Sequence, residues 1–186
     1  MSYNVEGMEF LSNCTNEELG FLVDFIKDTG GFTETMTNMG VYCEHYPNHR
    51  AYVDLIQREI IDFGYDSLKI FGDRSYKEVV KTVCKKMDVY DSSDDMYEME
   101  NKILREVFYD RLDELSEEDK KAILKNFNLN DIRKSNPAKM LFGMLMGIFS
   151  RTLLISDILL KISGPNYKVV GKAVSYIAYL RHKHGN

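Results

Sequence analysis

Apolar residues recur along this chain at intervals of three and four positions, which is the period of an α-helix. The sequence Thr15-Asn16-Glu17-Glu18 is a capping box, in which the first and last side chains satisfy each other's backbone N–H groups. The first clear apolar stripe follows it and consists of Leu19, Leu22, Val23 and Ile26. The pattern therefore predicts a helix that begins at Thr15 and ends at Gly30–Gly31.

A second stripe predicts a helix from about His49 to Phe63. Gly64 is expected in the C-terminal position that ends this helix, and Asp66 or Ser67 is expected to cap a short turn that follows. The preceding residues 32–48 are polar and irregular, and their proline is typical of a turn. That stretch is predicted to be a loop.

The rest of the chain is also predicted to be helical. The expected helices are residues 76–87, a long helix opened by the polar cluster 91–95 and ending near 114, then 116–126, 137–163 and 167–181. No segment shows the sustained alternation of a half-buried strand. The fold class is therefore expected to be all-α, a compact bundle of six to eight helices with a central apolar helix near the C-terminus.

Composition is that of a globular protein, and charge divides the chain in two. The 186 residues are 44% hydrophobic and 28% charged, which excludes a disordered chain and an ordinary multi-span membrane protein. Residues 1–115 hold 12 Lys and Arg against 24 Asp and Glu, whereas residues 116–186 hold 12 against 5. We therefore expect an acidic helical domain, residues 1–126, with a basic, apolar segment, residues 127–186, packed on it. Such a basic segment also suits an acidic partner or an anionic membrane surface.

Cysteine usage and the first residues indicate the compartment. Cys14, Cys43 and Cys84 are an odd number without paired spacing, which favours a reducing environment over a disulfide framework. The N-terminal sequence lacks the basic start and apolar run of a signal peptide. A cytoplasmic protein is expected, with membrane association as the alternative.

Signatures of enzyme chemistry are weak. Cys43, His45 and His49 are the best cluster of metal-ligand types, but a proline separates the two histidines and paired zinc-ligand spacings are absent. Asp66 and Ser67 lack the Gly-x-Ser-x-Gly context of a hydrolase nucleophile, and no Gly-rich phosphate loop occurs. We expect no cofactor and no catalysis, and a metal-dependent enzyme built on Cys43, His45 and His49 ranks last among the alternatives.

The C-terminal residues mix aromatic and basic side chains, which is the one feature that approaches a nucleic-acid-binding helix. These side chains are Tyr176, Tyr179, Arg181, His182, Lys183 and His184. An exposed helical tail explains them more simply. No nucleic-acid partner is therefore expected.

The segment Met140–Lys161 is the most informative part of the sequence. Its Gly143-x-x-x-Gly147 spacing permits close approach of another helix, and its methionines form an adaptable apolar surface. Arg151 and Asp157 oppose a bilayer span, because their insertion cost of about 5–7 kcal/mol offsets its apolar residues. A buried helix is favoured, and a partner-binding or membrane-interface face is the alternative. The candidate binding residues are Lys139, Leu141, Phe142, Met144, Leu145, Met146, Arg151 and Lys161.

Several ordered blocks resemble the bacterial YaaW-like family. Phe10-Leu11-Ser12-Asn13-Cys14-Thr15-Asn16-Glu17-Glu18-Leu19 is similar to that family's opening, Phe-Leu-x-x-Cys-(Ser/Thr)-x-Glu-x-Leu. The blocks His49–Ser67, Tyr76–Met87 and Gly164–Arg181 are similar to its second, third and closing blocks. Tyr65 stands where the family usually has a second glycine, and the Gly-rich hairpin usual before the closing helix is mostly missing.

The resemblance implies an all-α fold related to the helical ubiquinol–cytochrome c chaperone domain, which is an assembly factor rather than an enzyme. It carries over no catalytic residue. Together with the apolar segment, it predicts a protein that acts by binding another protein of acidic character, in a chaperone-like or regulatory role, through the Met-rich face. Peripheral membrane binding or disruption is the alternative, and pairing with a second copy into a homo-oligomer is a further option.

Overall fold

The computed structural model describes residues 3–27, 39–68, 73–90, 92–114, 117 and 165–184. Within these ranges the regular structure is helical, and extended pairing is limited to one isolated parallel bridge between Asn4 and Ser75. The elements are η1 (Glu9–Asn13), α1 (Asn16–Lys27), α3 (Gly40–His45), η2 (His49–Tyr52), α4 (Val53–Leu68), α5 (Tyr76–Lys86), α6 (Met96–Glu114) and α11 (Pro165–His184). The predicted all-α class is confirmed for this part of the chain.

Side-chain caps fix the start of two helices where the sequence predicts them. The Thr15 N–H donates to Glu18 Oε2 at 2.7 Å, and the Glu18 N–H donates to Thr15 Oγ1 at 3.3 Å, which is the reciprocal pattern of a capping box. Helix α5 begins after Ser75, whose hydroxyl accepts from the Glu78 N–H at 3.3 Å. Local polar chemistry is sufficient to predict both boundaries.

Helix α4 extends beyond its predicted end. It continues through Gly64 to Leu68, so Asp66 and Ser67 lie inside the helix and do not cap a following turn. Gly64 is a contact point with α5, because a Cβ added there would lie 2.7 Å from Val79 Cγ2. A glycine that lets two helices approach and a glycine that ends a helix have the same local sequence pattern. Only the position of α5 distinguishes them.

The segment predicted to be a loop contains a short helix, α3. It is anchored by Tyr42, which is buried with its ring centroid 5.5 Å from that of Tyr52 in η2. One inward residue makes no stripe, so helical periodicity could not reveal this element.

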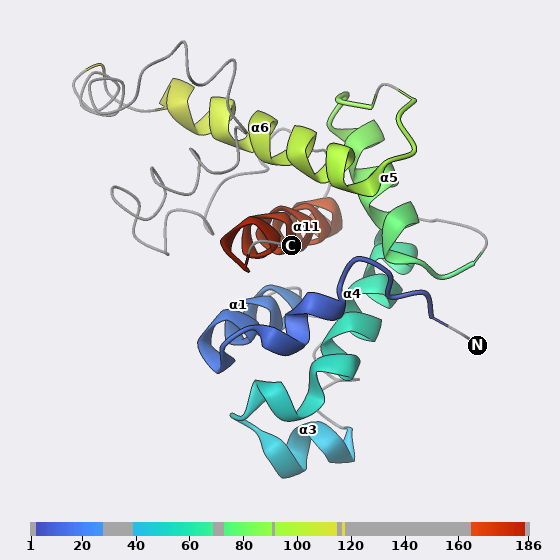
Figure 1. Cartoon of the computed structure of the whole chain (residues 1–186), viewed down its shortest axis with the longest axis vertical. Helices are drawn as coiled ribbons and strands as arrows, with labels where there is room; N and C mark the ends of the chain where they lie inside the picture. Colours follow the sequence, from blue (N-terminus) through green and yellow to red (C-terminus); the bar gives the residue numbers. More distant parts are fainter. Residues whose placement is uncertain are drawn as a thin grey trace.

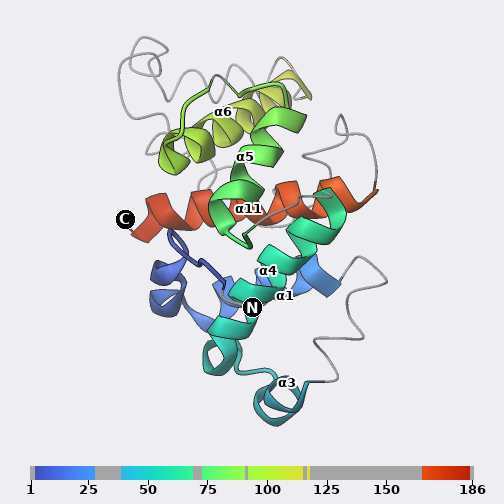
Figure 2. The same cartoon turned by 90° about the vertical axis from the view of Figure 1, so that its right-hand side faces the viewer.

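Helix α11 lies at the centre of the described fold. It contacts α1, α4, α5 and α6, and both views show it crossing between α1 and α4 on one side and α5 and α6 on the other (Figures 1 and 2). Its Val174, Ile177 and Leu180 are fully buried. The prediction of an exposed helical tail is wrong, since Tyr179 and Arg181 are buried as well. The apolar stripe of α11 continues to its last turn, so Tyr179 and Arg181, which adjoin this stripe, are buried with it.

Arg181 and Glu100 form an ion pair inside this core. Arg181 Nε donates to Glu100 Oε2 at 2.6 Å, and Arg181 Nη2 donates to Glu100 Oε1 at 3.0 Å and to the Gly7 carbonyl. The Tyr76 hydroxyl donates to Glu100 Oε1 at 2.8 Å. The guanidinium also lies 4.7 Å from the ring centroids of Phe10 and Tyr97. One side chain thus joins α11 to the N-terminal segment and to α6, and through Glu100 to α5.

Several predicted elements fall outside the described residues. They include the segment 137–163 and most of the helix predicted at 116–126, together with the division between residues 126 and 127, so these stay predictions. Among the helices that the structure describes, none is long and apolar enough to cross a membrane. Helix α11 comes from the basic part of the chain and packs on the acidic N-terminal helices.

A candidate binding groove beside helix α4

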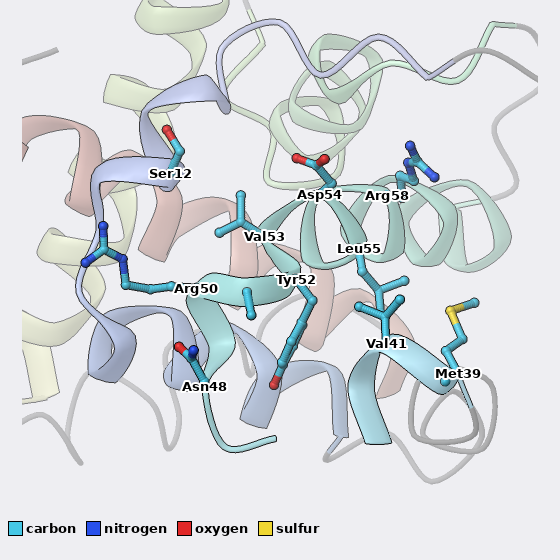
Figure 3. A pocket seen from close by; sticks show the side chains of 12 residues that line it. Ser12, Met39, Val41, Asn48, Arg50, Tyr52, Val53, Asp54, Leu55 and Arg58 are labelled. Carbon is cyan, nitrogen blue, oxygen red and sulfur yellow. The ribbon is translucent and has the colours of Figure 1, made fainter. Parts of the chain in front are cut away.

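An open groove of about 1100 Å³ lies between α3, η2 and the first turns of α4. Figure 3 shows the side chains that line it. Ser12 at the end of η1 closes one side, and Met39 and Val41 of the α3 segment close the other. The groove therefore combines three segments that are separated in the sequence.

Two arginines mark the opposite ends of the groove. Arg50 and Arg58 are both exposed and lie apart on either side of Asp54 (Figure 3). Arg58 places its guanidinium 5.9 Å from the Tyr3 ring centroid. Arg50 lies in the 3-10 helix η2, whereas Asp54 and Arg58 lie one turn apart on α4. The charges along the groove therefore follow the order positive, negative, positive.

Part of the groove is apolar. Val41 is 49% exposed, which places it among the most exposed large apolar side chains of the described residues. Leu55, which is half-buried on α4, lines the same groove (Figure 3). An apolar contact zone between two guanidinium groups can hold a ligand that is apolar at its centre and acidic at its ends.

An aromatic cluster adjoins the groove through Tyr52, which is one of the lining residues. His49 Nδ1 and the Tyr52 hydroxyl are 2.5 Å apart, and Lys27 lies over the Tyr42 and Tyr46 rings at 5.2 and 4.7 Å. Burial lowers the pKa of His49 and raises the pKa of Tyr52 to about 12. At neutral pH both groups are therefore uncharged, and the hydrogen bond joins a neutral imidazole to a neutral hydroxyl.

The structure does not bring together the three metal-ligand types singled out in the sequence. Cys43 and His45 are exposed on α3, while His49 faces Tyr52. Among the described residues, the side chains that do cluster are Cys14, Glu18 and His184, whose candidate ligand atoms all lie within 4.8 Å of one another. Sequence reasoning missed this group because 166 residues separate Glu18 from His184.

The binding residues predicted on the Met-rich segment fall outside the described residues. They are Lys139, Leu141, Phe142, Met144, Leu145, Met146, Arg151 and Lys161. The groove was missed by sequence reasoning, although a signal existed in the Arg50, Asp54, Arg58 spacing. The apolar side of the groove had no such sequence signal, because Val41 lies in a segment without helical periodicity.

Comparisons of the chain with family models, with curated proteins and with solved structures gave no match. The resemblance to the YaaW-like family, and the assembly role that it implies, therefore stay predictions.

Proposed function

We propose that this protein acts by binding another protein, in a chaperone-like or regulatory role, and that the groove beside α4 holds a helix of the partner. The observation that carries the proposal is the arrangement of Arg50, Val41 with Leu55, and Arg58 along one open surface. The Met-rich face around Leu141 remains the second proposed contact.

The charges of the groove define the kind of partner. Arg50 and Arg58 lie at different ends of the groove, with Asp54 between them. A partner helix with two separated acidic residues can place one carboxylate at each guanidinium. A leucine or phenylalanine between them would then contact Val41 and Leu55, and a basic residue would suit Asp54. Bidentate arginine–carboxylate pairs add orientation to the apolar contact.

The size of the groove favours a polypeptide over a small metabolite. Pockets for small molecules are commonly about 300–1000 Å³ and enclose most of the ligand. This groove is about 1100 Å³ and open to solvent. A helix laid across it would bury apolar area at Val41, which is where such an interaction gains most of its affinity.

The test begins with a photo-crosslinking amino acid at Val41 in the full chain. A second version carries it at Arg105, which is exposed on α6 away from the groove. A partner that crosslinks only at Val41 is purified, and its affinity is measured for wild type, for Arg50→Glu with Arg58→Glu, and for Arg105→Glu as the charge-matched control. We expect at least a tenfold loss in the groove variant and none in the control.

Charge exchange completes the test. Changing the partner's two acidic residues to lysine should restore binding to the Arg50→Glu, Arg58→Glu variant and weaken binding to wild type. Equal affinity of the groove variant and the Arg105→Glu control would overturn the proposal. So would flotation with anionic vesicles that is abolished by Leu141→Asp and unchanged by the groove substitutions, since this pattern supports the membrane alternative.

A further inference from the structure

Cys14, Glu18 and His184 meet where the two ends of the described chain come together. Cys14 follows η1, Glu18 lies in the first turn of α1, and His184 is the last residue of α11. Cys14 and Glu18 are buried, whereas the His184 side chain is 23% exposed, so solvent reaches the cluster from one side. The group combines a sulfur, an oxygen and a nitrogen donor within 4.8 Å.

These donor types are those that zinc uses in proteins. A tetrahedral zinc ion holds nitrogen and oxygen ligands at about 2.0–2.1 Å, which places two such atoms about 3.3 Å apart. His184 Nε2 and Glu18 Oε2 are 3.2 Å apart, so this pair already has the spacing of two ligands of one ion. Three protein ligands leave the fourth position of a tetrahedral ion to water.

Neighbouring groups orient the Glu18 carboxylate but leave one of its lone pairs available to a ligand. The Thr15 N–H donates to Glu18 Oε2, and Lys183 Nζ pairs with Glu18 Oε1, which leaves a lone pair of Oε2 directed at His184. Hydrogen bonds of this kind hold a carboxylate ligand in place beneath a metal ion. Glu18 can therefore keep both partners and still bind a cation.

The thiol of Cys14 is weakly held. Cys14 Sγ makes one long contact, 3.9 Å, to the Phe10 carbonyl. On binding a divalent ion the Cys14 thiol releases its proton, and the thiolate and the Glu18 carboxylate together neutralise the ion.

We propose that Cys14, Glu18 and His184 bind one zinc ion, which clamps the end of α11 to the first turn of α1. This site is independent of the groove beside α4, since it shares no residue with it. The ion joins segments 166 residues apart and so stabilises the closed core, because metal binding to the folded state alone shifts the unfolding equilibrium.

The experiment uses the full chain after removal of metal with a chelator, followed by titration with Co²⁺ and competition with Zn²⁺. We expect a thiolate-to-cobalt charge-transfer band in the near ultraviolet, one equivalent at saturation, and a zinc-dependent rise in the melting temperature. His184→Gln should weaken cobalt binding at least tenfold, and Cys14→Ser should abolish the band. The matched controls are His182→Gln, which changes a histidine that faces Asn101, and Cys84→Ser, which changes another buried cysteine.

If Cys14→Ser does not fold, the cobalt affinity of His184→Gln provides the test. This variant should fold, because His184 is partly exposed at the end of its helix. No thiolate band in wild type would overturn the proposal and leave a capping box with an ion pair. Equal loss of binding in His182→Gln and His184→Gln, or loss of the band in Cys43→Ser, would overturn it as well.

Discussion

Replacing Arg181 with methionine tests whether the buried ion pair holds the fold together. Methionine keeps much of the length and apolar bulk of the side chain but removes the two bonds to Glu100 and the bond to the Gly7 carbonyl. Glu100 is 1% exposed and would keep only its hydrogen bond from the Tyr76 hydroxyl. Removing one member of a buried pair leaves an uncompensated charge, which costs more than the pair contributes when both are present.

The expected loss in the free energy of unfolding is about 4 kcal/mol. Breaking a buried pair costs about 3–5 kcal/mol, and loss of the cation from between two aromatic rings adds about 1 kcal/mol, which the buried apolar methionine partly offsets. With a urea m-value of about 2 kcal/mol/M, the midpoint of unfolding falls by about 2 M. Urea titration followed by far-ultraviolet circular dichroism measures this shift. Arg105→Met on the exposed face of α6 is the control and should change stability by less than about 0.5 kcal/mol.

The pH dependence and a second substitution separate charge from packing. Burial raises the pKa of Glu100, and Arg181 opposes this rise. Without Arg181 the folded chain holds a proton that the unfolded chain releases, so the deficit of the variant should shrink as the pH falls from 7 towards the ordinary carboxyl range. Adding Glu100→Gln should recover about 1–2 kcal/mol at pH 7. A loss below about 1 kcal/mol for Arg181→Met, or one independent of pH, would refute the reasoning.

Three further outcomes follow from the packing. Gly64→Ala should destabilise the protein by about 1–3 kcal/mol, because its Cβ would lie 2.7 and 2.8 Å from the Val79 methyl groups, and Val79→Ala should reverse most of that loss in urea titrations. Burial raises the pKa of Glu59 to about 7, so the folded chain keeps a proton that the unfolded chain loses above about pH 4.5, and stability should fall as the pH rises through 7. Glu59→Gln should remove this slope and add up to about 3 kcal/mol at pH 8, whereas an unchanged slope would contradict the assignment. Of the three thiols, exposed Cys43 should react first with Ellman's reagent in native protein, while buried Cys14 and Cys84 should react only after unfolding.

The parts of the fold that the sequence predicts are those governed by local chemistry. The capping box at Thr15 and the stripe of α5 each lie within one short window, so their geometry follows from neighbouring residues. The prediction that Gly64 ends its helix was wrong, because the role of Gly64 depends on Val79, which belongs to another helix. The local sequence pattern shows which side chains are apolar, but it does not show which helix packs on them.

The candidate site shows the same limit. Asp54 and Arg58 share one face of α4 by their spacing, and this part of the site could be predicted from the sequence. The opposing apolar wall comes from Val41, which no periodic pattern identifies, and the Cys14 cluster needs His184 from the far end of the chain. Predicting either requires the tertiary arrangement of α3 or α11.

The central position of α11 has a consequence for synthesis. The helix that fills the middle of the core includes residues 165–184, whereas the surfaces that it covers belong to helices that begin as early as Asn16. A ribosome must therefore release nearly all of this sequence before the apolar faces of α1, α4 and α6 can be covered. During translation those faces are exposed to other nascent chains and to cellular chaperones. The core is therefore completed only after α11 has left the ribosome.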